Sequence, residues 1–254
     1  VQQGDDSPQL TPAISRVDET DLSGSSPIGT MGTVNVDFGN DGPGTLAPSG
    51  TFSVSGSALG GQLTSNGIPV TVTATANGYV GSYTLNGVTV TVFTLEINPV
   101  HGNYVFQQFR PLDHNDPNNP DDNLNLVFGV RATDSDGDSA TTTITIRVFD
   151  DGPKAVDDSA TVAENMTVIT GNVVTNDDVG ADGGVVQSVT FNNFIYPVVQ
   201  GTPTTIVGQY GTLVINANGS YTYTASGTNT TIVQDQFNYT IRDFDGDRDD
   251  AVLT

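Results

Sequence analysis

Residues 123–153 read NLNLVFGVRATDSDGDSATTTITIRVFDDGP, and this stretch decides the fold class. Apolar and polar residues alternate through 123–132 and again through 141–150, which is the period of a strand with one face buried. The acidic run DSDGD lies between these two segments and has the Asp-Gly composition of a tight loop. We therefore predict two strands separated by an acidic loop, with the acidic pair of DDGP at the end of the second strand.

The rest of the chain has the same character. Helical periodicity is nearly absent, and Val, Thr, Tyr, Phe and Ile alternate with polar residues between Gly, Asn, Asp and Pro turns. Further strands are predicted at 33–38, 51–56, 70–76, 88–97, 211–217, 220–225 and 235–243. Short strands at this spacing predict an all-β protein built from β-sandwiches.

An internal repeat sets the number of domains. The motif DDSP begins at Asp5 and DDGP begins at Asp150, and a Glu follows fourteen residues later in each copy, at Glu19 and Glu164. DSDGD likewise has a second copy, DFDGD, near the end of the chain. The repeat predicts two tandem β-sandwich domains: a larger one at 1–150 and a second at 151–254 that stops inside its last strand.

The charge is strongly acidic and unevenly distributed. The net charge is -22, from 29 acids and 7 bases, yet residues 42–95 and 183–234 contain no charged residue. Acids gather instead in short clusters, and a bound cation would offset their mutual repulsion. Such a chain is not expected to bind nucleic acid or anionic lipid, which both need a basic surface. With no cysteine and no long apolar run, disulfides and direct membrane insertion are not expected either.

The two DxDGD loops are the strongest candidate sites. Aspartates at alternate positions with a Gly between them let several carboxylates converge, and hard oxygen ligands at this density favour Ca²⁺ over Mg²⁺. The alternative is a solvated Asp-Gly hairpin turn, and we prefer calcium because each copy is joined to a Glu and an Asp pair at matching spacing. The candidate ligands in these loops are Asp134, Asp136, Asp138, Asp243, Asp245 and Asp247. The position of Gly excludes an EF-hand loop.

Other candidates stay open between ligand and ordinary turn. Asp177, Asp178 and Asp182 lie in NDDVGADG, and DFGNDG at 37–42 occupies a comparable place in the first domain. The segment 111–122, PLDHNDPNNPDD, is predicted to be a solvated loop and a place for a domain-specific contact.

Zinc and enzymatic chemistry are not favoured. Zinc prefers His or Cys, and the chain offers only His101 and His114, which we interpret as turn or surface residues. No GxSxG elbow and no phosphate-binding Gly loop before a helix is present, so we expect no enzyme.

These motifs resemble a known group of proteins. Residues 5–153 are similar to a repeat of large RTX-type bacterial adhesins exported by type I secretion. The similarity lies in the motifs VDETDL, VDFGNDGPG and PLDH and in the stretch 123–153. Residues 154–254 resemble cadherin-like or VCBS-like bacterial Ig-type repeats, through AVDDSATVAEN, YGTLVINANGSYTYT and FNYTIRDFDGD. The resemblance implies calcium at domain ends and junctions, with ligands at Asp5, Asp6, Glu19, Asp134, Asp136, Asp138, Asp150, Asp151 and Glu164.

The expected function is mechanical. We expect a monomeric, secreted segment of a longer chain at the bacterial cell surface, where calcium stiffens an extender and neighbouring repeats are its partners. The parent adhesin would bind a glycan or protein and support adhesion or biofilm formation. The alternative is a ligand-binding module for sugar or protein, with Tyr79 and Tyr83 on the neutral stretch 42–95, although plain strand surface is preferred there. A third possibility is an accessory domain of a secreted hydrolase.

Overall fold

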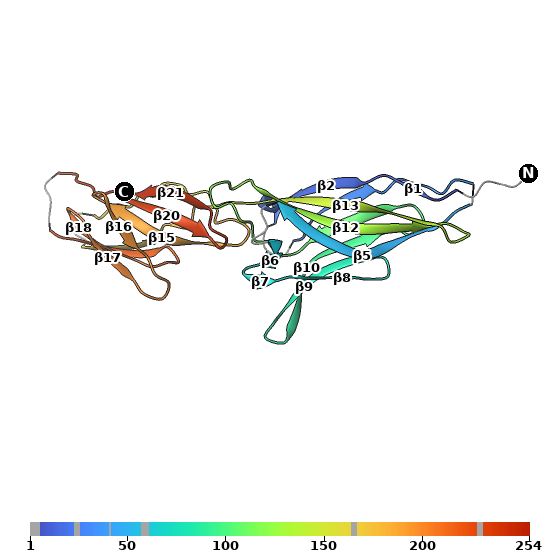
Figure 1. The fold of residues 1–254 in the computed structure, drawn as a ribbon. Helices are drawn as coiled ribbons and strands as arrows, with labels where there is room; N and C mark the ends of the chain where they lie inside the picture. Colours follow the sequence, from blue (N-terminus) through green and yellow to red (C-terminus); the bar gives the residue numbers. More distant parts are fainter. Residues whose placement is uncertain (1–5, 23–25, 41, 57–60, 164–166, 228–230) are drawn as a thin grey trace, which may run out of the picture. The chain divides into compact units, whose positions relative to one another are not determined.

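The computed structural model describes residues 6–22, 26–40, 42–56, 61–163, 167–227 and 231–254. Its contacts divide the chain into two compact units, one of residues 1–116 and 121–151 and the other of 117–120 and 152–254. Figure 1 shows that both units are built from strands. This confirms the predicted all-β class and the two tandem sandwiches. No helix in the described ranges is long or apolar enough to cross a membrane.

The first unit is a sandwich of two main sheets. The five-stranded sheet has the order β3-β11-β10-β9-β8, and the four-stranded sheet has the order β2-β13-β12-β5. The strands of the first sheet are β3 (Ile28–Thr33), β8 (Thr71–Ala74), β9 (Gly78–Leu85), β10 (Val88–Ile97) and β11 (Asn103–Gln108). Those of the second are β2 (Ala13–Asp18), β5 (Thr45–Gly56), β12 (Asn123–Thr133) and β13 (Ser139–Phe149). Smaller elements are β1 (Gln9–Leu10), β4 (Val36–Asp37), β6 (Thr64–Ser65), β7 (Ile68–Pro69) and the 3-10 turn η1 (Glu19–Asp21).

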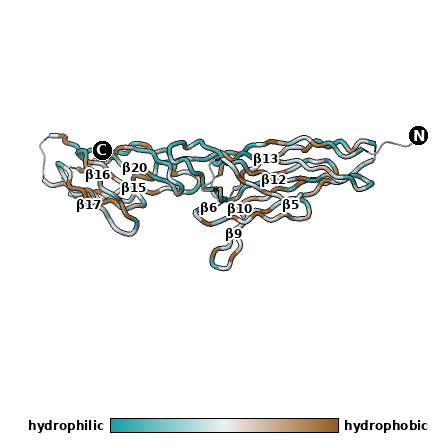
Figure 2. Tube along the Cα trace, in the orientation of Figure 1, coloured by the Kyte–Doolittle hydropathy of each residue, from teal (hydrophilic) through white to brown (hydrophobic). Residues whose placement is uncertain are grey.

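An aromatic cluster joins the two sheets of the first unit. The ring of Phe128 on β12 lies 5.2 Å from Tyr79 and 5.8 Å from Phe93 on the opposite sheet, measured between ring centroids. All three side chains are fully or almost fully buried. Figure 2 shows hydrophobic positions recurring along β12 and β13, as expected for strands with one buried face. The core therefore follows the alternation that the sequence displays.

Two predictions about this unit need correction. The strand predicted at 33–38 is broken, because Val34 donates its N–H to Gly102 O at 2.9 Å and only Val36–Asp37 re-enters a sheet. Tyr79, expected on plain strand surface or, in the alternative, on a ligand-binding surface, is instead 1% exposed, and its Oη donates to Gly129 O at 2.7 Å. A period of two locates a strand but does not tell which of its faces meets the second sheet.

The second unit is a smaller sandwich of two four-stranded sheets, with orders β14-β19-β18-β17 and β16-β15-β20-β21. The strands are β14 (Val168–Asn172), β15 (Gly184–Phe191), β16 (Phe194–Pro197), β17 (Thr204–Val207), β18 (Gly211–Ile215), β19 (Ser220–Ala225), β20 (Phe237–Asp243) and β21 (Arg248–Leu253). Its core includes Phe191 and Phe237, whose ring centroids are 5.0 Å apart. Each unit therefore has a hydrophobic core of its own.

Candidate metal centres

The DSDGD loop of the first unit connects β12 to β13 and closes on itself. The N–H of Asp134 donates to Asp138 O at 3.0 Å, and the N–H of Gly137 donates to Asp134 Oδ1 at 3.1 Å. Gly137 has φ of +108°, a conformation that a residue with a Cβ rarely adopts. The loop thus needs Gly at this position, and the closure turns the alternate aspartates toward one point.

The carboxylates of this loop come together. Asp134, Asp136 and Asp138 each offer an oxygen, and the three oxygens lie within 4.8 Å of one another. Asp134 is 7% exposed, and its buried Oδ2 has no hydrogen-bond partner in the described part of the chain. Burial raises the pKa of Asp134 above its ordinary value, and the neighbouring Asp136 adds to this shift. A cation at this point would supply the interaction that the buried oxygen lacks.

Polar groups from the start of the chain border this loop. Ser7 donates its Oγ–H to Asp138 Oδ2 at 3.1 Å, and Asn40 donates to Asp6 Oδ2 at 2.8 Å. The predicted candidate Asp6 and the DFGNDG segment are therefore neighbours, although the segment also forms an ordinary turn in which Gly39 N–H donates to Asp37 Oδ1 at 2.9 Å. The predicted ligand Asp5 lies outside the described residues.

The DFDGD loop of the second unit has the same construction. The N–H of Asp243 donates to Asp247 O at 3.1 Å, and Gly246, with φ of +130°, donates its N–H to Asp243 Oδ1 at 2.9 Å. Asp243 is 4% exposed, and its buried Oδ2 has no hydrogen-bond partner among the described residues. Burial raises the pKa of Asp243, and the charge of Asp247 adds to the increase. Asp245 lies in the same loop and is half-buried. The two copies of the motif therefore share the closure of the loop on its first aspartate, while among the described residues only the first copy groups its own three aspartates.

A second cluster in the first unit forms where β2 and β13 end side by side. These strands are parallel, with Asp18 opposite Phe149, so the next residues along them, Glu19 and Asp150, emerge together. His114 joins them, and one ligand atom from each of the three lies within 4.8 Å of the others. All three side chains are buried, with exposed fractions of 0% for Glu19, 3% for His114 and 2% for Asp150.

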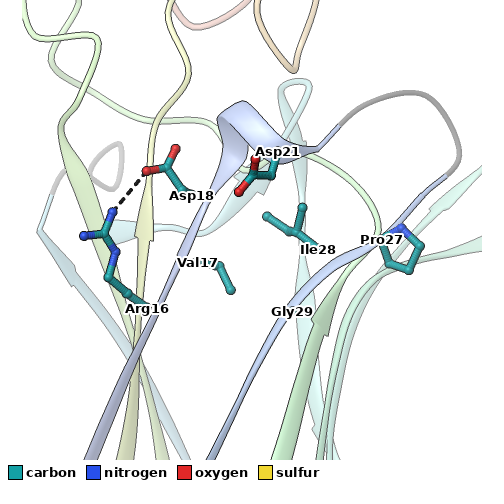
Figure 3. Close-up of a pocket in the computed structure, with 7 residues that line it drawn as sticks. All are labelled: Arg16, Val17, Asp18, Asp21, Pro27, Ile28 and Gly29. Atoms are coloured by element: carbon teal, nitrogen blue, oxygen red, sulfur yellow. Dashed lines mark hydrogen bonds and ion pairs between the residues drawn. The ribbon is translucent and has the colours of Figure 1, made fainter.

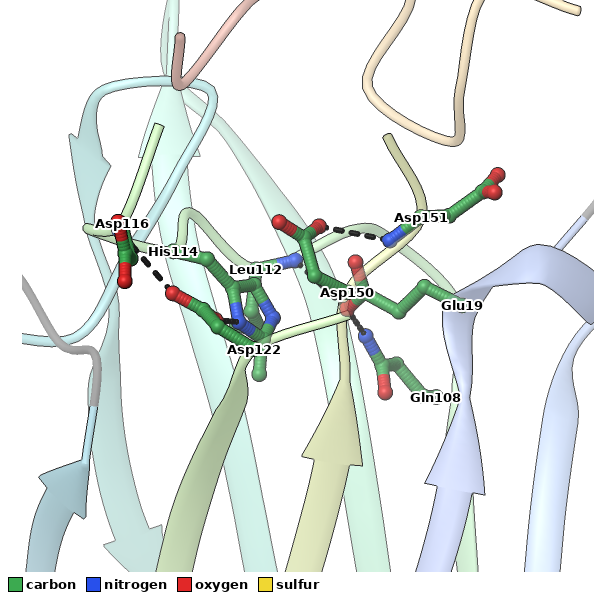
Figure 4. Close-up of polar contacts among 8 residues, drawn as sticks. All are labelled: Glu19, Gln108, Leu112, His114, Asp116, Asp122, Asp150 and Asp151. Carbon is green, nitrogen blue, oxygen red and sulfur yellow. Dashed lines mark hydrogen bonds and ion pairs between the residues drawn. The ribbon is translucent and has the colours of Figure 1, made fainter. Parts of the chain in front are cut away.

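Hydrogen bonds orient each member of this cluster (Figure 4). Gln108 Nε2 and the Leu112 N–H both donate to Glu19 Oε1, the latter at 3.0 Å. His114 Nδ1 lies 2.6 Å from Asp122 Oδ1, and the Asp151 N–H donates to Asp150 Oδ1 at 2.8 Å.

Sequence reasoning missed this histidine. The segment 111–122 is not a wholly solvated loop: residues 111–114 and Asp122 are buried, and only 115–121 are exposed. Ser65 donates its Oγ–H to Pro111 O at 2.6 Å, and the Gly67 N–H donates to Asp113 Oδ2 at 2.8 Å. The interpretation of His114 as a turn or surface residue is therefore wrong. His101 does lie exposed in a turn, at the end of β10.

The remaining predicted ligands lie apart from these clusters. The carboxylate of Asp151 points away from Asp150 in Figure 4. Asp177 Oδ1 accepts the Val156 N–H at 2.7 Å, and Asp178 Oδ1 accepts the Gly180 N–H at 3.3 Å. Asp182 is half-buried in the same loop. Within the described ranges, no group of three ligating side chains includes Asp177, Asp178 or Asp182.

Glu164 lies outside the described residues. Calcium at the junction between the two repeats, which the resemblance implies, therefore stays a prediction.

Asp177 belongs to a carboxyl pair around one buried phenol. Tyr239 Oη lies 2.9 Å from Asp158 Oδ2 and 3.2 Å from Asp177 Oδ2. Burial raises the pKa of both carboxyl groups, and the charge of Asp177 adds to the increase at Asp158. Asp158 has no acidic match in the first repeat, and the structure gives it this hydrogen-bonding role at the core edge.

A hollow of about 510 Å³ lies beside η1 (Figure 3). Its polar lining includes Arg16 and Asp18, which form an ion pair of 3.1 Å between exposed side chains. Such pairs contribute roughly 0–1 kcal/mol and are screened by salt. This hollow therefore has no feature of a built binding site.

Comparisons with known proteins place the two units in sequence families. Residues 15–147 match the model described as "Domain of unknown function (DUF5801)", and residues 150–254 match the bacterial cadherin-like domain. The second match indicates an extracellular repeat module, and neither model describes an enzyme family. A search of curated proteins finds no match.

Solved structures with similarity to the chain include cadherin fragments. Drosophila N-cadherin EC1-4 is 15% identical, with 98% of this chain and 49% of that chain covered and a TM-score of 0.28. Mouse Cadherin-23 EC22-24 is 13% identical, with 98% of both chains covered and a TM-score of 0.28. This chain thus spans about half of the N-cadherin fragment. TM-scores this low add nothing to what the strand topology already establishes.

The family model at 15–147 covers more than half of the 254 residues. The chain therefore belongs to the family described as domain of unknown function DUF5801, and its residues 150–254 match the model of the bacterial cadherin-like domain.

Proposed function

We propose that this chain is a calcium-stiffened extender segment of a bacterial cell-surface adhesin of the RTX type, exported by type I secretion, that supports adhesion or biofilm formation. The match of residues 150–254 to a bacterial cadherin-like domain supports this role, because such domains are extracellular modules that generally bind calcium. The net charge of -22 also supports this role, because bound calcium ions would offset part of the repulsion among the acidic residues.

The single observation that carries the proposal is the shared construction of the two DxDGD loops. In each unit the first aspartate is buried, its Oδ1 accepts the N–H of the loop Gly, and its Oδ2 has no hydrogen-bond partner in the described part of the chain. An unmet buried carboxylate oxygen is costly in the absence of a cation. Calcium accepts six to eight oxygen ligands in flexible geometry, so it suits a loop of carboxylates and carbonyls.

Calcium would act on folding and on stiffness together. An ion that binds the folded state but not the unfolded chain stabilises folding by mass action. A chain exported unfolded from a compartment of low calcium would then fold outside the cell, where calcium is abundant. We propose neighbouring repeats of the same long chain as its partners, with any glycan or protein ligand bound through the parent adhesin.

Thermal unfolding in excess calcium and in excess chelator tests the proposal. Calcium is expected to raise the midpoint of unfolding of both units, whereas magnesium at equal concentration is expected to have a smaller effect because it keeps its waters and demands a stricter octahedron. Equal melting temperatures in calcium and in chelator would refute calcium-dependent folding of this segment.

A ligand-binding module remains the second candidate function. A cavity of about 840 Å³ in the second unit is lined in part by Tyr210, Tyr221 and Tyr223, and aromatic rings are common in small-molecule sites. The hydroxyl of Tyr223 is held by Asp235 Oδ2 at 2.7 Å. Binding of the protein to a glycan array that is lost in Tyr210→Ala would favour this function, and the absence of any binding to the array would refute it.

A further inference from the structure

The cluster of Glu19, His114 and Asp150 differs in chemistry from the two DxDGD loops. Its ligand atoms lie within 4.8 Å of one another, and one of them is an imidazole nitrogen. We propose that these three residues bind a borderline transition-metal ion, with Zn²⁺ as the ion that their chemistry favours. The site would be separate from the DSDGD loop of the same unit and independent of whether calcium binds in that loop.

The donor set selects the metal. Calcium and magnesium take oxygen ligands, whereas zinc combines imidazole nitrogen with carboxylate oxygen. One His with two carboxylates is a three-ligand set, and such a set leaves a fourth tetrahedral position for water or another group. The His therefore changes the metal proposed for Glu19 and Asp150 from calcium to zinc.

His114 is oriented as metal-binding histidines usually are. Its Nδ1 lies 2.6 Å from Asp122 Oδ1, and the ring is placed between Asp122 and the pair of Glu19 and Asp150 in Figure 4. A carboxylate at Nδ1 holds the proton there, so that Nε2 presents its lone pair on the opposite side of the ring. Asp122 itself is tied on both sides, because its Oδ2 accepts the Asp116 N–H at 3.0 Å and its backbone O accepts the Asp150 N–H at 3.0 Å.

The two carboxylates are also held in place. Glu19 Oε1 accepts hydrogen bonds from the Gln108 side chain and from the Leu112 N–H, and Asp150 Oδ1 accepts the Asp151 N–H. These donors come from two segments of the first unit, residues 108–112 and the end of β13, and they fix carboxylates that are distant in sequence, so the fold builds the arrangement. A site whose ligands are already oriented loses less entropy when the ion binds.

Charge balance gives a second reason for a cation. Glu19 and Asp150 are almost completely buried and close together, and like charges in such surroundings repel strongly. A divalent ion offsets both charges at once. The competing explanation is that His114 is an imidazolium paired with the surrounding carboxylates, which requires no metal.

Nitrogen-15 NMR of the imidazoles separates the two explanations, because the chain has only two histidines. Zinc is added in one equivalent to the intact protein in excess calcium, so that oxygen-only sites are already filled. We expect the Nε2 resonance of His114 to shift as a metal ligand, while the resonances of exposed His101 stay in place. An unchanged His114 resonance, or an Nε2 that remains protonated in the presence of zinc, would overturn the proposal.

Variants then measure the contribution of each group by zinc titration. His114→Gln is expected to weaken zinc binding at least 100-fold, and Asp122→Asn about 10- to 100-fold, the usual range for a residue that orients a ligand. His101→Gln is the matched control and is expected to leave the affinity unchanged. Zinc affinity that survives in folded His114→Gln would overturn the assignment, and if that variant fails to fold, the NMR measurement on the unaltered chain decides.

The zinc and calcium proposals fail separately. Asp136→Asn is expected to reduce the calcium-dependent rise in melting temperature and to leave zinc affinity unchanged. Zinc binding without any calcium effect would refute the extender proposal alone, and a calcium effect without zinc binding would refute this one alone.

Discussion

Replacing the first aspartate of each DxDGD loop is expected to have opposite effects with and without calcium. In chelator, the ionised carboxylate of Asp134 destabilises the folded state, because burial raises its pKa. Asp134→Asn removes that charge, keeps an oxygen to accept the Gly137 N–H, and places an amide where Asp136 and Asp138 can accept its hydrogens. The variant should therefore be as stable as the parent chain, or more stable, in chelator at neutral pH.

In calcium the order should reverse. Ion binding at 100 times the dissociation constant stabilises the folded state by about 2.7 kcal/mol. For a unit of this size, 1 kcal/mol moves the melting temperature by roughly 2–4 °C, so the calcium effect is on the order of 5–10 °C. Asp134→Asn should lose most of this rise in the first unit and leave the second unit unaffected, and Asp243→Asn should do the converse.

The assay must report each unit separately, because two-domain chains do not unfold in one step. The chain has no tryptophan, so amide hydrogen exchange read by mass spectrometry is better suited than fluorescence. Glu96→Gln serves as the control, since it removes one negative charge from an exposed position on β10. Full calcium-dependent protection of the first unit in Asp134→Asn would refute the assignment of the loop as a calcium site.

Three further predictions concern stability without metal. Burial raises the folded-state pKa of Asp158 and Asp177. Their stabilising contribution to the folded state is therefore present below the ordinary Asp pKa of about 3.9 and is lost as the pH rises through the raised pKa values. Asp158→Asn should flatten this pH dependence of stability in chelator, and an unchanged pH profile of stability would contradict the prediction. Phe128→Ala should lower the free energy of unfolding of the first unit by about 3–5 kcal/mol in denaturant titrations, against a change within about 0.5 kcal/mol for Phe194→Ala, whose side chain is 70% exposed. Gly78→Ala would place a Cβ 1.8 Å from Leu95 O, so it should cost about 1–3 kcal/mol by the same titration, and a neutral result would show that β9 and β10 can separate there.

Strand positions were largely readable from the sequence. The segments predicted at 88–97 and 220–225 coincide with β10 and β19, because alternation over such a length leaves one register that buries the apolar face. The break within 33–38 was not readable, since it arises where Val34 bonds to Gly102, a residue distant in sequence. Local periodicity contains no information about such long-range hydrogen bonds.

The DxDGD loops could be predicted from the sequence, whereas the cluster of Glu19, His114 and Asp150 could not. Each DxDGD loop is a local structure, and its closure depends on a Gly with positive φ and on aspartates two residues apart. The cluster at the other end of the first unit was not found as such, because a Pro- and Asn-rich segment with one His is typical of a solvated loop. Burial of residues 111–114 against Thr64, Ser65 and Gly67 reverses that interpretation.

The sequence by itself determined the all-β class, the two tandem sandwiches and the closed acidic loops, because alternation, repetition and loop chemistry act over a few residues. Only the tertiary structure decided that Glu19, Asp150 and His114 meet. The parallel pairing of β2 with β13 sets Asp18 opposite Phe149 and so brings Glu19 beside Asp150 across more than a hundred residues. The loop after β11 then adds His114, held by Asp122. Strand order and parallel register result from how two sheets close over one core, and no single segment encodes them.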